Sequence, residues 1–141
     1  MSTEAPRHLA RIVVLQSLYA SEHGDQTVDE AFESIAEQEG LKEKYRKFAY
    51  DLLIEVSKRT TWADSQIEEL ADNWELERIA AIDKMIMRMG MVELNVFIDT
   101  PVKVVINEAI ELAKEYSTNA SSKFINGILD NFVKRNEEKT N

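Results

Sequence analysis

The sequence predicts an all-α protein of about seven helices. Apolar residues recur at helical spacing in segment after segment, whereas the alternation typical of strands is missing. Only four glycines and two prolines interrupt the 141 residues, which favours long helices over a sheet with many turns. The run from Val102 to Ile106 could pass for a strand, but the proline before it and the helical spacing after it favour a helix.

The amino-terminal part is expected to hold three helices. Residues 1–6 are predicted to be a disordered lead, and a first helix runs from Arg7 to about Glu22 with a deeply buried middle. A short acidic helix starts near Thr27 and ends at Gly40, in the usual capping position. The third helix carries a regular apolar stripe, formed by Tyr45, Phe48, Ala49, Leu52, Leu53 and Val56.

Two further helices are expected before residue 100. Thr61, followed by Asp64 three residues later, approximates a capping box at the start of the fourth helix. The fifth helix is predicted to run without a break from about Leu76 to Phe97, with isoleucines and methionines on its inner stripe.

The stretch from Pro101 to Lys134 predicts a helical hairpin. Thr100 supplies a capping hydroxyl and Pro101 suits the first helical position. A polar elbow over residues 117–122 separates the two apolar stripes, and Gly127 in the second helix suggests a close backbone crossing. Residues 135–141 are expected to form a polar tail that frays.

The hairpin also carries a resemblance to a known family. INEAIELAKEY followed by SSKFINGILD resembles the carboxy-terminal signature of NusB, a family of bacterial transcription antitermination factors. The similarity reaches back through most of the chain, at residues 74–79, 87–89, 92–94, Arg11 and 16–19. It implies a pair of small helical bundles packed across each other, in a single RNA-binding domain over residues 7–134.

The resemblance further implies function through assembly. Proteins of this family pair with NusE, a small-subunit ribosomal protein, and bind boxA-type single-stranded RNA in an RNA polymerase antitermination complex that supports ribosomal RNA transcription. The net charge of −9 argues against indiscriminate binding to nucleic acid, because affinity for phosphate comes mainly from Lys and Arg. An RNA site must therefore be a local basic patch.

Arg7, His8 and Arg11 are the first candidates for that patch. The two arginines lie four residues apart on one helix face, and the guanidinium fork matches phosphate geometry. From these residues alone an ordinary charged helix end is favoured, but the resemblance implies contact with boxA RNA. On that basis, Arg11→Ala is expected to weaken RNA binding with little effect on stability.

Lys123 and Phe124 are the second candidates, because a cation beside an aromatic ring suits single-stranded RNA. The resemblance implies RNA contact for both, and it also matches Tyr19 to a family tyrosine near the same surface. For Phe124 and Tyr19, packing in the core is the alternative. The sequence does not decide between RNA contact and core packing for either residue.

A protein partner is suggested by the fifth helix. Met85, Met87 and Met91 fall off its main stripe, and methionine adapts well to partner surfaces; a helix buried on several sides is the alternative. The resemblance implies that Glu77, Asp83 and Met87 contact NusE, whose basic character complements acidic residues. Four polar residues within apolar helices are expected to be buried or half-buried and hydrogen-bonded: Arg88, Glu93, Asn107 and Glu108.

No catalytic, cofactor or metal site is predicted. The sequence has no cysteine, no glycine-rich phosphate loop and no metal-ligand spacing, and His23 is expected to be a solvated surface imidazole. No apolar run approaches the ~20 residues of a membrane span, so a cytoplasmic protein is expected. Two alternatives remain: a helical adaptor that binds only proteins, and a stand-alone relative of the RNA-binding domain of ribosomal RNA methyltransferases.

Overall fold

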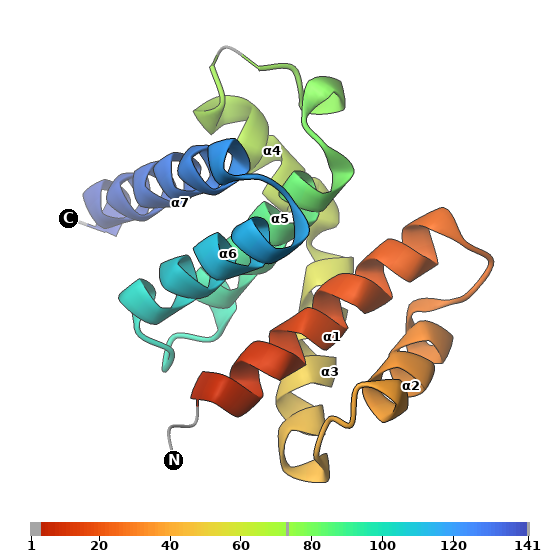
Figure 1. Cartoon of the computed structure of the whole chain (residues 1–141). Helices are drawn as coiled ribbons and strands as arrows, with labels where there is room; N and C mark the ends of the chain where they lie inside the picture. The colour runs from red at the N-terminus through yellow and green to blue at the C-terminus, as the bar shows by residue number, and fades with distance from the viewer. Residues whose placement is uncertain (1–3, 73, 141) are drawn as a thin grey trace. The chain divides into compact units, whose positions relative to one another are not determined.

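The computed structural model describes residues 4–72 and 74–140, and over these residues it contains seven α-helices, one short 3-10 helix and no strand (Figure 1). The prediction of an all-α protein is confirmed. Contacts divide the chain into two compact units, one ending at Lys58 and the other starting at Arg59. Two helical units agree with the expected pair of small bundles, while the single domain over residues 7–134 stays a prediction.

The first unit contains α1 (Glu4–His23), α2 (Val28–Gln38) and α3 (Glu43–Lys58). Helix α1 packs against both α2 and α3. Its middle is deeply buried, as the sequence predicts, because apolar residues cover more than one face there. The buried apolar residues of α1 are Ala10, Ile12, Val13, Val14 and Leu15.

Helix α2 begins and ends where local sequence signals require. The Thr27 hydroxyl accepts the Glu30 N–H at 3.1 Å, and the Glu30 carboxylate accepts the Thr27 N–H at 3.4 Å, which completes a capping box. After the helix, Gly40 adopts a left-handed φ of 70°, and the Leu41 N–H donates to the Ala36 carbonyl at 2.9 Å. The predicted glycine cap at residue 40 is thus confirmed.

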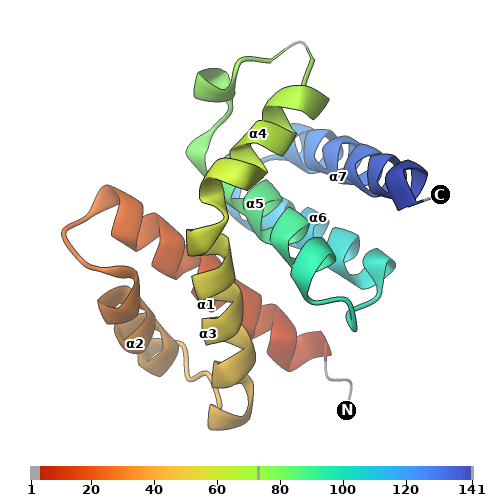
Figure 2. The same cartoon turned by 180° about the vertical axis from the view of Figure 1, so that it is seen from behind.

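The second unit contains α4 (Thr60–Leu70), the 3-10 helix η1 (Leu76–Arg78), α5 (Ala81–Val96), α6 (Val102–Tyr116) and α7 (Asn119–Thr140). Helix α5 packs against α4, α6 and α7. Helices α6 and α7 lie side by side in both views (Figures 1 and 2). The predicted helical hairpin is therefore present.

Both ends of the described chain are more helical than predicted. Helix α1 includes residues 4–6 of the expected disordered lead, since Pro6 lies in the first turn, where its missing N–H has no intrahelical partner to lose. Helix α7 continues through residues 135–140 of the expected tail. Arg135 donates to Glu69 of α4 at 2.6 Å and also to Gln66, and these contacts hold the helix beyond its apolar stripe. The parts of the two predictions that concern residues 1–3 and 141 lie outside the described residues.

Three predicted helix boundaries are wrong. The N-cap of α4 is Arg59, two residues before Thr61, and it makes no side-chain capping bond. The Asp64 carboxylate accepts two hydrogen bonds from Arg88, at 2.7 and 3.0 Å, in place of the predicted capping bond. The expected fifth helix is interrupted after η1, where Ile79 and Ala80 are extended. The side chain of Ile79 is nevertheless buried, so its apolar spacing alone could not reveal the break. Pro101 occupies the N-cap of α6 rather than the first helical position.

The close helix crossing lies at a different glycine from the one predicted. A Cβ added at Gly127 would meet nothing within 4 Å, whereas one added at Gly90 would lie 3.0 Å from Leu129 Cδ1. Gly90 therefore marks the close approach of α5 and α7. Of the predicted polar residues inside helices, Glu93 is buried and Arg88 half-buried as expected, but Asn107 is exposed.

Candidate RNA-binding and partner-binding residues

The start of α1 holds its arginines against an aromatic ring. The guanidinium carbon of Arg7 lies 4.8 Å from the centroid of the Phe48 ring, and that of Arg11 lies 5.3 Å from it. Arg7 and His8 are half-buried, but Arg11 is only 1% exposed. Arg11 is thus part of the packed interior, and the expectation that it can be truncated with little loss of stability is corrected.

Tyr19, near the end of α1, is an exposed aromatic residue. Its side chain is 42% exposed, so the alternative of core packing is wrong. One face of the ring stacks on His23, with a centroid distance of 4.2 Å and an angle of 19° between the planes. His23 is exposed, as expected for a surface imidazole. Contact between Tyr19 and RNA stays a prediction.

Lys123 and Phe124 lie in the first turns of α7. The elbow before them is shorter than predicted, because Thr118 caps the helix by accepting the Ser121 N–H at 2.9 Å. Lys123 is exposed and Phe124 is half-buried. The Phe124 ring packs edge-on against Trp74, with 6.0 Å between centroids. Phe124 is therefore partly buried and partly accessible, and its RNA contact stays a prediction.

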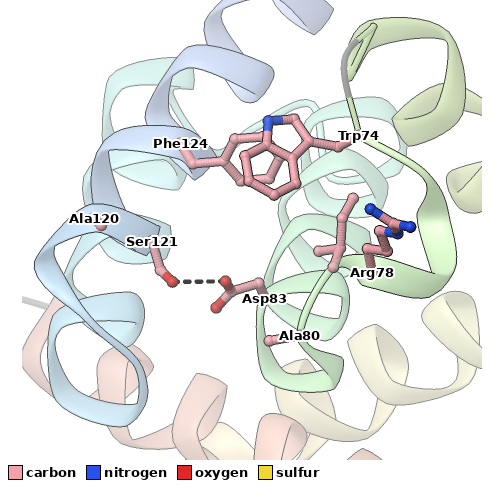
Figure 3. Close-up of a pocket in the computed structure, with 8 residues that line it drawn as sticks. Trp74, Arg78, Ala80, Asp83, Ala120, Ser121 and Phe124 are labelled. Atoms are coloured by element: carbon pink, nitrogen blue, oxygen red, sulfur yellow. Dashed lines mark hydrogen bonds between the residues drawn. The ribbon is translucent and has the colours of Figure 1, made fainter.

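A pocket of about 290 Å³ opens beside Phe124 in the second unit (Figure 3). The start of α7, the start of α5 and the segment around η1 form its walls. It is lined by Trp74, Arg78, Ile79, Ala80, Asp83, Ala120, Ser121 and Phe124. Trp74 lies beyond the end of α4 and is 56% exposed. The pocket brings together residues from three separate segments, so the sequence reasoning could not find it.

Asp83 lies between this pocket and the start of α7. It is 6% exposed, and one carboxylate oxygen, Oδ2, accepts the Ser121 hydroxyl at 2.6 Å (Figure 3). The other oxygen, Oδ1, is buried and has no hydrogen-bond partner among the described residues. A buried acceptor in this state is unusual, since nearly all buried polar atoms are satisfied.

The predicted partner-binding residues differ in accessibility. Glu77 is exposed on η1. Met87, by contrast, is fully buried, as are the neighbouring Met85 and Met91. The proposal that these methionines form a partner surface is corrected: α5 has neighbours on several sides, and the methionines fill the interior between them.

Two further kinds of feature, a metal site and a membrane span, are missing from residues 4–72 and 74–140. No cluster of three or more His, Cys, Asp or Glu side chains suited to a metal ion occurs there. No helix in that part of the chain is both long and apolar enough to cross a membrane.

Comparison with known proteins places the chain in a family. Residues 8–134 match the NusB family. The chain belongs to the NusB family. Transcription antitermination protein NusB of Chloroherpeton thalassium is 42% identical over 125 residues, which cover 88% of this chain and 59% of that protein. The chain thus spans less than two thirds of the length of this relative.

Solved structures show the same fold. NusB from T. maritima superposes with a TM-score of 0.84 at 32% identity, covering 95% of this chain and 93% of that one. A second similar structure is described as the antitermination factors NusB and NusE in complex with dsRNA. It has a TM-score of 0.82 at 23% identity and covers 93% of this chain and 98% of that one. The NusB fold is therefore shown for this chain.

Proposed function

We propose that this NusB-family chain is a transcription antitermination factor that pairs with NusE and binds boxA-type RNA within an RNA polymerase elongation complex. The observation that carries the proposal is the family match over residues 8–134. The family relative from C. thalassium is itself named a transcription antitermination protein. The chain would act by assembly in the cytoplasm, without catalysing a reaction, and would support transcription of ribosomal RNA.

The accessible cations and aromatic rings support RNA binding. Lys123 and Tyr19 are exposed, and Arg7, His8 and Phe124 are half-buried. Exposed lysine can neutralise a phosphate and an aromatic ring can stack on a base. A chain of net charge −9 with so few cations at the proposed site would bind RNA weakly alone, because few phosphates would be neutralised.

The charge of the chain also supports a basic partner. Ribosomal proteins are basic, and Glu77 offers an exposed carboxylate on η1. One protein of similar fold is described in a complex of NusB, NusE and dsRNA, so the NusB fold is compatible with binding both molecules. A basic partner docked beside the RNA site would extend the positive surface. Once one protein of the pair has bound the RNA, the other is held close to it, so the effective concentration for the second contact is raised.

The test is an RNA titration followed by fluorescence anisotropy, with and without saturating NusE. We expect NusE to tighten binding of boxA RNA by about tenfold or more, equivalent to ~1.4 kcal/mol of coupling. Linkage requires RNA to tighten NusE binding by the same factor. Equal RNA affinity in both arms would contradict the cooperative assembly, and NusE binding without any RNA binding would favour the protein-only adaptor.

A charge reversal tests the partner surface separately. Glu77→Lys should weaken NusE binding by roughly 1 kcal/mol or less if the residue lies at the rim of the interface, because rim charges are well solvated. Isothermal titration calorimetry in low salt measures the change, with the exposed Glu137→Lys on α7 as control. Undiminished NusE affinity in Glu77→Lys would remove η1 from the interface.

A further inference from the structure

We infer that the start of α3 provides a further RNA contact, which binds the phosphates of nucleotides outside the boxA element whatever their sequence. The inference rests on the proposed RNA-binding function and extends it to another surface of the first unit. It starts from residues 42–47, KEKYRK, which we call the basic segment. Four of these six residues are Lys or Arg, in a chain whose net charge is −9.

The helical structure of the first unit gives no reason for a cation at this place. Helix α3 begins at Glu43, so Lys44 is its second residue. The first turn of a helix carries a positive partial charge, which favours carboxylates and disfavours cations. The charge of Lys44 is therefore unfavourable to the helix itself, and this points to a ligand outside the helix.

The cations of the basic segment differ in whether they are paired. Arg46 forms an ion pair with Glu33 of α2 at 2.8 Å, and Lys47 pairs with Asp51 at 2.7 Å. Lys42 and Lys44 are exposed, and neither forms an ion pair with any residue that the structure describes. The Lys44 ammonium lies 5.7 Å from the centroid of the Tyr45 ring, a contact that uses none of its three N–H donors. Both ammonium groups are thus available to an external anion.

The basic segment continues the proposed RNA site on α1. The starts of α1 and α3 lie at the same end of the first unit in both views (Figures 1 and 2). The Arg7 guanidinium carbon lies 4.8 Å from the centroid of the Phe48 ring, and Phe48 is one helical turn beyond Lys44 on the same face of α3. An RNA strand that contacts Arg7 would therefore pass next to Lys44. This continuity favours RNA over an acidic protein as the ligand.

The surrounding charges confine the path of that strand. Residues 22–41 include seven carboxylates and no Lys or Arg, and they contain α2, which packs against both α1 and α3. These carboxylates repel phosphates, so the RNA would follow the side of α3 that faces away from α2. Exposed lysines act as point charges on phosphate and do not read base edges. The contact would therefore add affinity without sequence preference.

The experiment compares boxA RNA with the same RNA carrying a uridine tail at each end, titrated against the full chain with saturating NusE. We expect the tailed RNA to bind about fivefold more tightly at low salt, because more phosphates are neutralised. The slope of log affinity against log salt should be steeper by about 1.4, since each of two phosphate contacts with a single strand contributes about 0.7. Adenosine tails of equal length should give the same gain.

A double variant assigns the gain to the basic segment. Lys42→Ala combined with Lys44→Ala should abolish the advantage of the tailed RNA and leave the affinity for untailed boxA RNA unchanged. The matched control is Lys103→Ala combined with Lys114→Ala, which removes two exposed lysines from α6 in the second unit and produces the same net charge. This control should keep the advantage. Circular dichroism should show an unchanged fold for both variants, because all four side chains are exposed.

Three results would overturn the inference. The first is equal affinity of the unaltered chain for tailed and untailed RNA, and the second is an undiminished advantage in the Lys42 and Lys44 double variant. The third is binding of a poly-glutamate peptide that is lost in this variant while the RNA advantage persists, which would assign the surface to an acidic protein. Absence of binding to untailed boxA RNA, even with NusE, would instead refute the proposed function together with this inference.

Discussion

The starts of α1 and α7 both carry cations that are predicted to contact RNA, but the structure places these cations differently. In α1, Arg11 lies against Phe48 inside the first unit and is almost fully buried. In α7, Lys123 points to solvent while its neighbour Phe124 packs against Trp74 at the edge of a pocket. A cation near the start of a helix therefore serves packing in the first unit and stays accessible in the second.

The difference shows that a cationic residue in a helix need not be accessible at the protein surface. A guanidinium is more weakly hydrated than an ammonium and stacks well on aromatic rings, so arginine tolerates burial against Phe48. Lysine keeps its ammonium in water. Arg7 lies between the two cases, since it is half-buried and also approaches Phe48. Three substitutions to alanine test this order.

Arg11→Ala should have the largest effect on stability. Truncating a side chain that is 1% exposed leaves a cavity and removes the contact with Phe48, which together cost about 2–4 kcal/mol in the free energy of unfolding. Urea denaturation measures the change, with the exposed Arg78→Ala as control. Full stability of Arg11→Ala, together with a lower salt dependence of RNA binding, would contradict this prediction. Arg11 would then be an RNA contact and not a packing residue.

Arg7→Ala should have an intermediate effect. Loss of its contact with Phe48 is expected to cost about 0.5–1 kcal/mol of stability, the usual range for a cation near an aromatic face with partial solvent access. The same variant should reduce the slope of log affinity against log salt by about one in RNA titrations, if Arg7 neutralises one phosphate. A stability loss with an unchanged slope would assign Arg7, like Arg11, to packing alone.

Lys123→Ala should have the smallest effect on stability, within about 0.5 kcal/mol, because the side chain is exposed. Its effect should fall on RNA binding, where the salt slope is expected to decrease by about one. Lys134→Ala, an exposed lysine farther along α7, is the matched control and should leave the slope unchanged. Identical slopes for the two lysine variants would remove the start of α7 from the RNA site.

Much of the fold could be predicted from local sequence signals. The helical class follows from apolar spacing, and the end of α2 follows from Gly40, whose left-handed φ of 70° is a local backbone requirement. The hairpin of α6 and α7 follows from two apolar stripes separated by polar residues. These features depend on residues a few positions apart, so no long-range contact is needed to infer them.

The candidate site was predictable only in part, because accessibility depends on distant residues. Glu77 and Lys123 are exposed as a partner or RNA contact requires, but Met87 is enclosed by the helices around α5. Asp64 resembled a capping residue, yet it pairs with Arg88, which lies 24 positions away. A pattern identifies which side chains a helix offers, and it does not identify which of them another helix covers.

The sequence by itself determined the all-α class, the order of the helices and membership of the NusB family, because helical periodicity and motif spacing are properties of neighbouring residues. Only the tertiary structure decided that Arg11 is interior, that Gly90 rather than Gly127 marks the close crossing, and that Trp74, Asp83 and Phe124 surround one pocket. The physical reason is that burial, close packing and the satisfaction of buried polar atoms arise between segments far apart in the chain.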